Sequence, residues 1–176
     1  VIVASWLATA LGQLSTHAVE GPLGLFEDHR DIGAVNRSGG VTFDPASNRY
    51  ALRGGGANMW SGTDAFHFVW KRVSGDLELG ADLEWLAAGG NAHRKACLLI
   101  RQSLDPGSPY ADAAWHGDGL TSLQFREETG GPTREIQAAI SAPHRLRVER
   151  YGDFISLSAA RAGEPFRARH FPAAED

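Results

Sequence analysis

Apolar and polar residues alternate along the chain in short runs, most clearly between residues 77 and 126. Leu77–Trp85 has an apolar residue at every second position, with acidic residues or glycine between them. The same period of two runs through Lys95–Arg101, Tyr110–His116 and Thr121–Arg126. Because successive side chains of a β-strand point to opposite faces, this pattern predicts strands with one face toward a core. Gly117-Asp118-Gly119 separates the last two runs and predicts an antiparallel hairpin.

Similar but weaker alternation extends over most of the remaining chain. Further strands are expected at Val41–Phe43, Arg49–Arg53, Asp64–Arg72, Thr133–Ile140, Arg145–Arg150 and Phe154–Ala159. Twenty-one glycines and eight prolines are spread between the runs, as turns require. Gly54-Gly55-Gly56 lacks the Lys-Ser/Thr ending of a phosphate-binding loop, so it is expected to be a bend or bulge. The pattern predicts an all-β fold of two packed antiparallel sheets, a sandwich or jelly roll.

The strands around the predicted hairpin have one unusually polar face. If Trp115 points into the core, the opposite face carries basic, acidic, amide and imidazole groups. These groups form the candidate ligand-binding set: Lys95, Arg101, Asp112, His116, Gln124 and Arg126. Such a face offers planar hydrogen-bond partners of the kind that bind sugars, and Asp112 could orient the two arginines. The alternative is a solvated face with ordinary cross-strand ion pairs, which are individually weak.

The chain opens on an apolar run, Val1–Leu11, followed by small and polar residues. With Thr16 and Ala18 at the positions that precede a cleavage site, residues 1–18 are expected to be the remnant of a secretory signal. The mature domain would then start near Val19, cover 19–176, and lie in the periplasm or outside the cell. A strand or helix packed on the core is the alternative for this segment. The run is too short to span a membrane.

Size and charge narrow the classes of protein. A chain of 176 residues with 43% hydrophobic and 22% charged residues suits one globular domain. The formal net charge of −4 gives no electrostatic basis for nucleic-acid binding. The single cysteine, Cys97, excludes an intrachain disulfide and a zinc site built from cysteines. It is expected to be an inert, partly buried thiol.

The acidic residues suggest two kinds of chemistry, glycoside hydrolysis and calcium binding, and each has a simpler explanation. Glucanases of the sandwich type place carboxylates alternately on one strand, and Glu78, Asp82 and Glu84 share a face, but Gly80 interrupts their ladder. An acidic solvent-facing strand is the simpler interpretation. No cofactor is expected. Calcium held by loop oxygens of Asp105 and Asp118 is the alternative, although turn-forming aspartates explain both positions.

The tryptophans are expected to serve mainly as core residues. Trp70, Trp85 and Trp115 fall on the apolar phase of their strands. Trp60 lies in a loop, and it is the one indole that could form an aromatic platform for a ligand.

Several long motifs together resemble a bacterial family. They are FHFVWKRVSGD, HRKACLLIRQSLDPGSPYADAAWHGDGLTSLQFRE and RLRVERYGDF, with FEDHRDIGAV and GGGANMW before them. This sequence resembles the concanavalin A-like domain of secreted TolB-like proteins, in which the domain follows a signal peptide and precedes a six-bladed β-propeller. The resemblance covers residues from about Gly24 to Phe166. It departs in two respects: the last strands of the domain and the propeller are expected to be missing, and Cys97 replaces a small apolar residue.

The resemblance implies a concanavalin A-like jelly-roll sandwich, of the lectin and glucanase type. The expected function is that of a non-catalytic exported module. Its partner would be a glycan, or the β-propeller of a longer protein. A glycoside hydrolase or lyase of the glucanase type is the alternative, so enzymatic activity stays open.

Overall fold

The computed structural model describes residues 2–5 and 22–168, and these residues contain strands, turns and bends but no helix. The strands are β1 (Ile2–Ser5), β2 (Asp28–Ile32), β3 (Gly40–Asp44), β4 (Arg49–Arg53), β5 (Phe66–Trp70), β6 (Leu77–Trp85), β7 (Lys95–Arg101), β8 (Tyr110–His116), β9 (Thr121–Arg126), β10 (Arg134–Gln137), β11 (Arg145–Tyr151), β12 (Phe154–Ala160) and β13 (Arg167–Ala168). Within this part of the chain, there is accordingly no apolar helix of membrane-spanning length.

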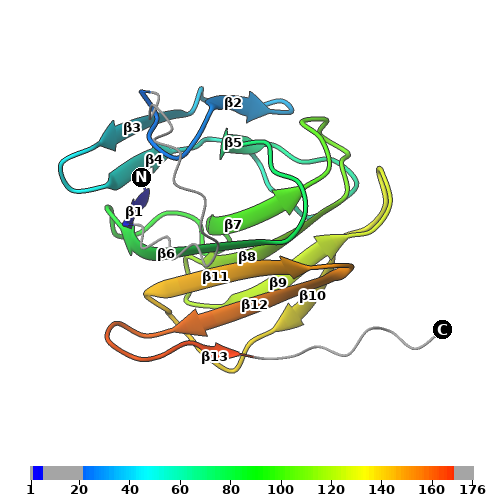
Figure 1. Ribbon diagram of the computed structural model, residues 1–176. Coiled ribbons are helices and arrows are strands. Elements are labelled where there is room, and N and C mark those ends of the chain that lie inside the picture. Colours follow the sequence, from blue (N-terminus) through cyan, green and yellow to red (C-terminus); the bar gives the residue numbers. More distant parts are fainter. Residues whose placement is uncertain (1, 6–21, 169–176) are drawn as a thin grey trace.

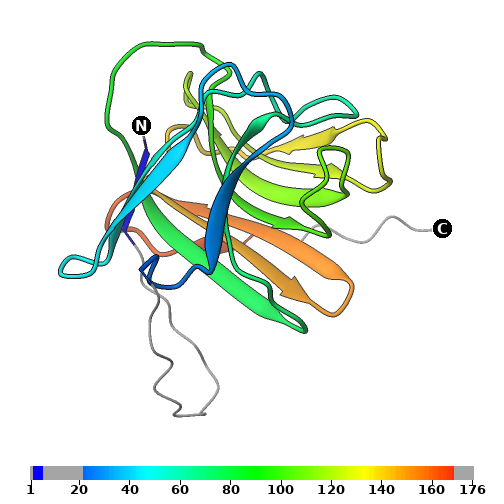
Figure 2. The same cartoon turned by 90° about the horizontal axis from the view of Figure 1, so that it is seen from above.

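The strands form two main antiparallel sheets and a separate pair (Figure 1). The larger sheet is seven-stranded, in the order β13-β12-β11-β6-β1-β4-β3. The second sheet has the order β10-β9-β8-β7, and β2 pairs with β5 alone. Seen from above, the green and yellow strands β7–β10 form a layer distinct from β6, β11 and β12 (Figure 2). The prediction of an all-β antiparallel sandwich is confirmed; its assignment to the concanavalin A-like jelly rolls stays a prediction.

The core lies between these two layers. Every second residue of the facing strands contributes to it, as the alternating pattern requires. The buried cluster consists of Tyr50, Ala81, Leu83, Leu98, Ala113, Trp115, Leu123, Leu146, Val148, Leu157 and Ala159. The rings of Trp85 and Trp115 pack across the two sheets with centroids 5.3 Å apart. The polar groups that alternate with these residues on β7, β8 and β9 therefore lie on the opposite face of the four-stranded sheet.

The predicted turn between β8 and β9 is formed by a glycine in a left-handed conformation and by an aspartate that bonds to the backbone. Gly119 has a φ of +97°, a conformation that glycine adopts without steric cost. The Asp118 carboxylate accepts a hydrogen bond from the N–H of Leu120 at 3.0 Å, which fixes the turn. The hairpin aligns Asp112 with Gln124 and Tyr110 with Arg126 across the two strands.

The N-terminal segment is only partly described. Ile2–Ser5 forms β1, which lies between β4 and β6 and runs antiparallel to both. Thr16 and Ala18, the proposed cleavage positions, lie outside the described residues. The signal-peptide prediction for residues 1–18 therefore stays a prediction.

Truncation of a central core side chain should destabilise the sandwich strongly. Leu146 on β11 is fully buried in the cluster, so Leu146→Ala should lower the free energy of unfolding by about 2–5 kcal/mol. Leu86→Ala, at a side chain that is 45% exposed, should change it by less than about 0.5 kcal/mol. Urea denaturation of both variants measures the difference. Equal effects would contradict the position of the core between the two sheets.

Candidate functional site

The six candidate residues all project from one face of the four-stranded sheet. We call this the outer face, since it is turned away from the core. The register aligns Arg101, Tyr110 and Arg126 in one cross-strand row, and Asp112, Gln124 and Glu135 in the next. Lys95 and His116 form a pair at the other end of the strands. The alternation of the sequence placed all six side chains on one face. The expectation that they all form an open binding surface is wrong for Asp112, His116, Gln124 and Arg126, which are buried there.

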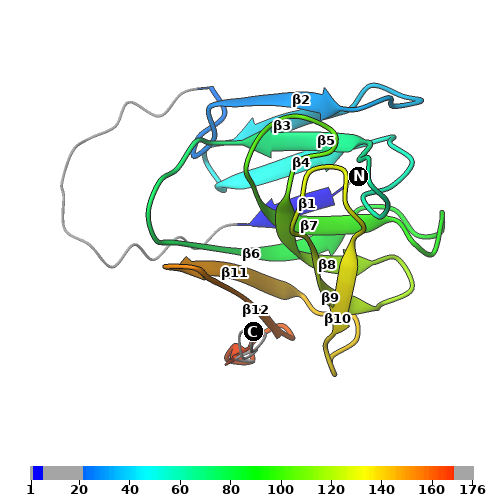
Figure 3. The same cartoon turned by 90° about the vertical axis from the view of Figure 1, so that its right-hand side faces the viewer.

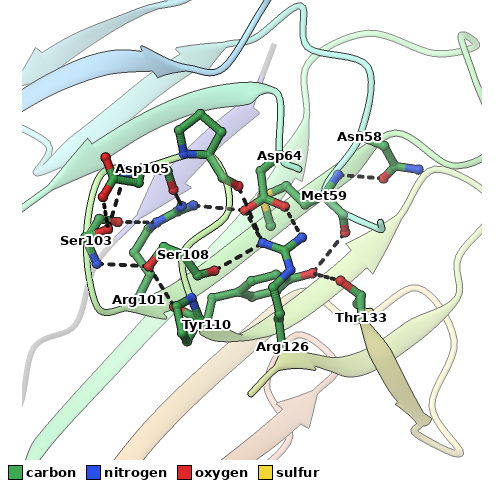
Figure 4. A network of polar contacts seen from close by, with 12 residues as sticks. Asn58, Met59, Asp64, Arg101, Ser103, Asp105, Ser108, Tyr110, Arg126 and Thr133 are labelled. Atoms are coloured by element: carbon green, nitrogen blue, oxygen red, sulfur yellow. Dashed lines mark hydrogen bonds and ion pairs between the residues drawn. The ribbon is translucent and has the colours of Figure 1, made fainter. Parts of the chain in front are cut away.

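At the row that contains Arg126, the outer face is closed by the protein's own loops (Figure 4). The Arg126 side chain is fully buried and binds Asp64 through two nitrogen–oxygen contacts, of 2.6 and 2.9 Å. It also donates to the backbone oxygens of Ser108 and Gly131, each at 3.1 Å, and to that of Ser61. A planar guanidinium suits this arrangement because its five N–H groups diverge in fixed directions.

Arg101 and Tyr110 extend the same network. The Arg101 guanidinium lies 3.4 Å from the second oxygen of Asp64 and donates to the backbone oxygens of Ser103 and Asp105. The Tyr110 hydroxyl lies 3.0 Å from the Met59 carbonyl oxygen and 3.0 Å from the Thr133 hydroxyl. We call Asp64, Arg101, Tyr110 and Arg126 the arginine cluster. The expectation that Asp112 orients the two arginines is wrong, because Asp64 occupies that role.

Asp64 reaches this position through the loop between β4 and β5. Gly56 allows the loop to approach the chain closely, since a Cβ at this position would collide with the carbonyl of Ala65. The Asp64 N–H then donates to the carbonyl oxygen of Pro106 at 2.9 Å, which holds the loop against the next one. Gly54 and Gly55 follow β4 without regular structure, and Gly56 forms an isolated antiparallel bridge with Val35, so the role of this run is steric.

The other end of the outer face carries a hydrogen-bonded polar row. The Lys95 ammonium donates to the Gln124 side-chain oxygen at 2.8 Å and to the Met59 carbonyl oxygen at 3.2 Å. The Gln124 amide nitrogen lies 2.8 Å from Glu135 and 3.2 Å from the His116 ring. We call Lys95, His116, Gln124 and Glu135 the polar row. Although partial burial alone would raise the pKa of Glu135, hydrogen bonds from Gln137 and Gln124 hold it below its usual value.

Trp60 stands beside the polar row. Its indole is 42% exposed, and the Lys95 ammonium lies 5.4 Å from the centre of its ring. Burial, and then the neighbouring charge of Lys95, lower the pKa of His116, so this imidazole is neutral near pH 7. The His116 and Gln124 side chains are buried, so the groups here that a small polar ligand can reach are the exposed Trp60 ring and the partly exposed Lys95 and Glu135.

Asp112 lies between the two ends and is fully buried. Neither of its carboxylate oxygens has a hydrogen-bond partner of normal geometry among the described residues. Burial raises its pKa to about 7, against the opposing effects of the Lys95 charge and the adjacent Cys97 thiol. Burial also raises the pKa of Cys97 well above its usual value, so the thiol stays protonated. Asp112 is therefore a titrating group inside the sheet rather than an exposed ligand-binding carboxylate.

The candidate catalytic and metal-binding carboxylates occupy ordinary structural positions. On β6, Asp82 pairs with Arg145 at 2.6 Å and Glu78 with Arg147 at 3.5 Å, both arginines lying on the neighbouring strand β11. The carboxylates of Asp105 and Asp118 bind groups of their own turns. Among residues 2–5 and 22–168, no three histidine, cysteine, aspartate or glutamate side chains gather as a metal site would require.

Fold and site together define an antiparallel β-sandwich whose outer face is closed at one end and polar at the other. In comparisons with known proteins, no family model, no curated protein and no solved structure matches this chain. The resemblance to the concanavalin A-like domain of TolB-like proteins therefore rests on the sequence motifs alone.

Loss of the Asp64 carboxylate should expose the structural role of the arginine cluster. Asp64→Ala leaves two buried guanidinium groups without their shared partner and should cost about 3–5 kcal/mol of stability. Glu127→Ala breaks the exposed pair between Glu127 and Arg134, so it should cost less than about 1 kcal/mol. Chemical denaturation of both variants tests this. A small effect of Asp64→Ala would show that the loop does not depend on the ion pair.

Asp112 should make stability depend on pH in a definite direction. Its pKa is raised in the folded state from its ordinary value of 3.8, so the fold binds the proton more tightly than the unfolded chain does. This contribution to stability is present below about pH 4 and is lost as the pH rises through about 7. Asp112→Asn should therefore stabilise the protein by about 2–4 kcal/mol near pH 8, and hardly at all near pH 4.

The measurement is the difference in unfolding free energy between wild type and Asp112→Asn across this pH range. Taking the difference cancels the titration of all other carboxylates. An Asp112→Asn variant that is less stable than wild type at alkaline pH would contradict the raised pKa.

Proposed function

We propose that this protein is a non-catalytic, exported sandwich module that binds carbohydrate at the polar row of its outer face. The observation that carries the proposal is the exposed Trp60 ring beside Lys95, Gln124 and Glu135. Sugars present apolar ring faces together with hydroxyl groups that both donate and accept, so a site for them combines an aromatic platform with planar polar partners. The apolar run that precedes Thr16 and Ala18 supports export.

The structure narrows the proposed site relative to the sequence expectation. Arg101 and Arg126 are committed to Asp64 and backbone oxygens, so their role in the proposal is to hold the loop that carries Trp60. Lys95 remains as a candidate for direct contact, and Glu135 joins it. The buried Gln124 bonds to both of them and to the buried His116, so these two residues position the contact groups. Since these groups already bond to one another, a ligand must exchange existing hydrogen bonds, and the expected affinity is weak, with a Kd of about 0.1–1 mM.

A second observation favours the interaction role that the family resemblance implies. Tyr151 and Phe154, at the tip of the β11–β12 hairpin, are 77% and 59% exposed. Large exposed side chains of this kind often mark a protein contact. We therefore keep docking against a β-propeller as the second candidate, with this hairpin as the contact. Protection of both aromatic side chains from oxidative labelling, seen only when the propeller is present, would support it.

Saccharide binding can be tested directly at Trp60. A glycan array followed by calorimetry should identify a ligand, and Trp60→Ala should weaken its binding by at least about tenfold through loss of the aromatic contact. Tyr151→Ala removes another exposed aromatic side chain, far from the polar row in the sequence and on the other main sheet, and should leave binding unchanged. The absence of binding across the array, or equal affinities of wild type and Trp60→Ala, would refute the proposal.

A further inference from the structure

A cleft of about 960 Å³ lies between β5 and β7, and Lys95 is the one member of the polar row that also lines it. In both side views the strands follow one another in the order β2, β5 and β7 (Figures 1 and 3). Residues from β5 and β7 line the cleft, together with Leu79, Leu83 and Trp85 of β6 in the opposite sheet. The cleft therefore reaches from the surface to the apolar core. We call it the β5–β7 cleft.

One wall of this cleft is an open strand edge. Within the described part of the chain, β7 pairs with β8 on one side and with no strand on the other. The N–H of Gly117 donates to the Arg94 oxygen at 2.8 Å, and the N–H of Gln102 donates to the Pro109 oxygen at 3.2 Å. In an antiparallel ladder, residues that bond to the neighbour alternate with residues whose backbone groups point away. Both bonds involve even-numbered residues, Arg94 and Gln102, so the even-numbered residues of β7 bond to β8. The backbone groups of the odd-numbered residues point into the cleft: Lys95, Cys97, Leu99 and Arg101.

The larger sheet shows how an extended segment fills such a position. There, β1 lies between β4 and β6, with Ala4 opposite Tyr50 on one side and Leu83 on the other. The next strand along the chain after β4 is β5, and the next after β6 is β7. The cleft between β5 and β7 therefore corresponds, in the facing layer, to the place that β1 fills between β4 and β6. Lining residues Leu52 of β4 and Leu83 of β6 come from the two strands that flank β1. With β1 present, the larger sheet is continuous at this place and the other is interrupted. Removal of residues 1–18 as a signal would also take β1 out of the larger sheet.

The lining also indicates which side chains would fit. Its inner part is apolar, and the indole N–H groups of Trp70 and Trp85 are buried there without a hydrogen-bond partner among the described residues. Its rim includes the exposed apolar side chains of Leu25 and Val73. Seven lining residues are lysine or arginine and two are acidic, although the whole chain has a net charge of −4. An occupant with apolar groups inward and negative charge outward would match both parts.

We infer that the β5–β7 cleft accepts an extended peptide segment of a partner protein, which adds as a β-strand to the open edge of β7. The segment alternates apolar side chains, directed into the core, with acidic side chains directed toward the basic rim. Backbone hydrogen bonds to Lys95, Cys97, Leu99 and Arg101 supply the pairing, as in other cases of strand addition. This surface differs from the proposed carbohydrate site because it uses a strand edge and not the outer face, although Lys95 borders both.

The binding probe is a fluorescently labelled, end-blocked peptide, Val-Glu-Leu-Glu-Val-Glu-Leu, measured by anisotropy. Two control peptides separate the parts of the proposal. Lysine in place of glutamate should weaken binding by at least about tenfold, because it meets the basic rim with like charge. N-methylation at alternate positions should weaken it similarly, because it removes the donors that a strand needs. A probe that does not bind, or that binds no more tightly than these controls, overturns the inference.

Protein variants locate the binding. Leu99→Pro removes a backbone N–H that points into the cleft and not toward β8, so it should abolish binding while β7 and β8 stay paired. Arg72→Glu reverses a charge on the exposed rim and should weaken binding by at least about fivefold, whereas Arg161→Glu, at an exposed position outside the cleft lining, should not. Thermal melting shows whether Leu99→Pro folds. If Leu99→Pro does not fold, the comparison of Arg72→Glu with Arg161→Glu and the control peptides still test whether the peptide binds in the cleft.

Amide hydrogen exchange provides the most specific readout. Peptide addition should slow exchange at Cys97 and Leu99, which point into the cleft, with little change at Leu98, which is already bonded to β8. Binding without this alternating protection would place the peptide elsewhere and overturn the inference. Protection of the same amides in the free protein at high concentration, accompanied by dimer formation, would assign the edge to a second copy of the chain and would equally overturn it.

Discussion

The arrangement of the outer face depends on one guanidinium group. Arg126 is buried at a point where three loops meet, and it binds Asp64, Ser61, Ser108 and Gly131 at once. A buried arginine without partners would be strongly unfavourable, so the folded chain must supply partners for this guanidinium. The same contacts hold the loops that provide them. The arginine cluster thereby fixes the loop that carries Trp60, whose indole is exposed.

The two candidate binding surfaces are the polar row beside Trp60 and the open edge of β7, and both belong to the four-stranded sheet. On the four-stranded sheet, loops cover the Arg126 row and leave the polar row beside Trp60. At the edge of the same sheet, β7 has no second neighbour among the described strands, whereas the larger sheet is continuous through β1. The surface beside Trp60 and the open strand edge favour different ligands, since the first offers side chains and the second offers backbone groups. Lys95, at the start of β7, lies at the junction of both.

The sequence predicted the strands far better than the contacts between them. β4, β6, β7, β8 and β9 begin and end at the predicted residues, because period-two alternation directly reflects a sheet with one buried face. The partner of Arg126 was not predicted. Asp64 is 62 positions away along the chain and lies at a strand boundary, where alternation carries no information about which distant strand the residue meets. Glu135 was missed for a related reason, since only the register between β9 and β10 places it beside Gln124.

The partners of Arg126 also determine where the loops can vary. At Ser61, Ser108 and Gly131 the guanidinium binds main-chain oxygens, which every amino acid possesses, and only Asp64 contributes a side chain. Substitutions at Ser61 can therefore preserve the closure as long as the backbone path is kept. Ser108 is more constrained, because its buried hydroxyl accepts from the Ser103 N–H and donates to the Pro109 oxygen. Ligand preference can then change through loop residues next to the polar row, while the aspartate–arginine pair maintains the scaffold. A library that randomises those residues and leaves Asp64 and Arg126 intact would be a practical starting point for engineering new binding proteins.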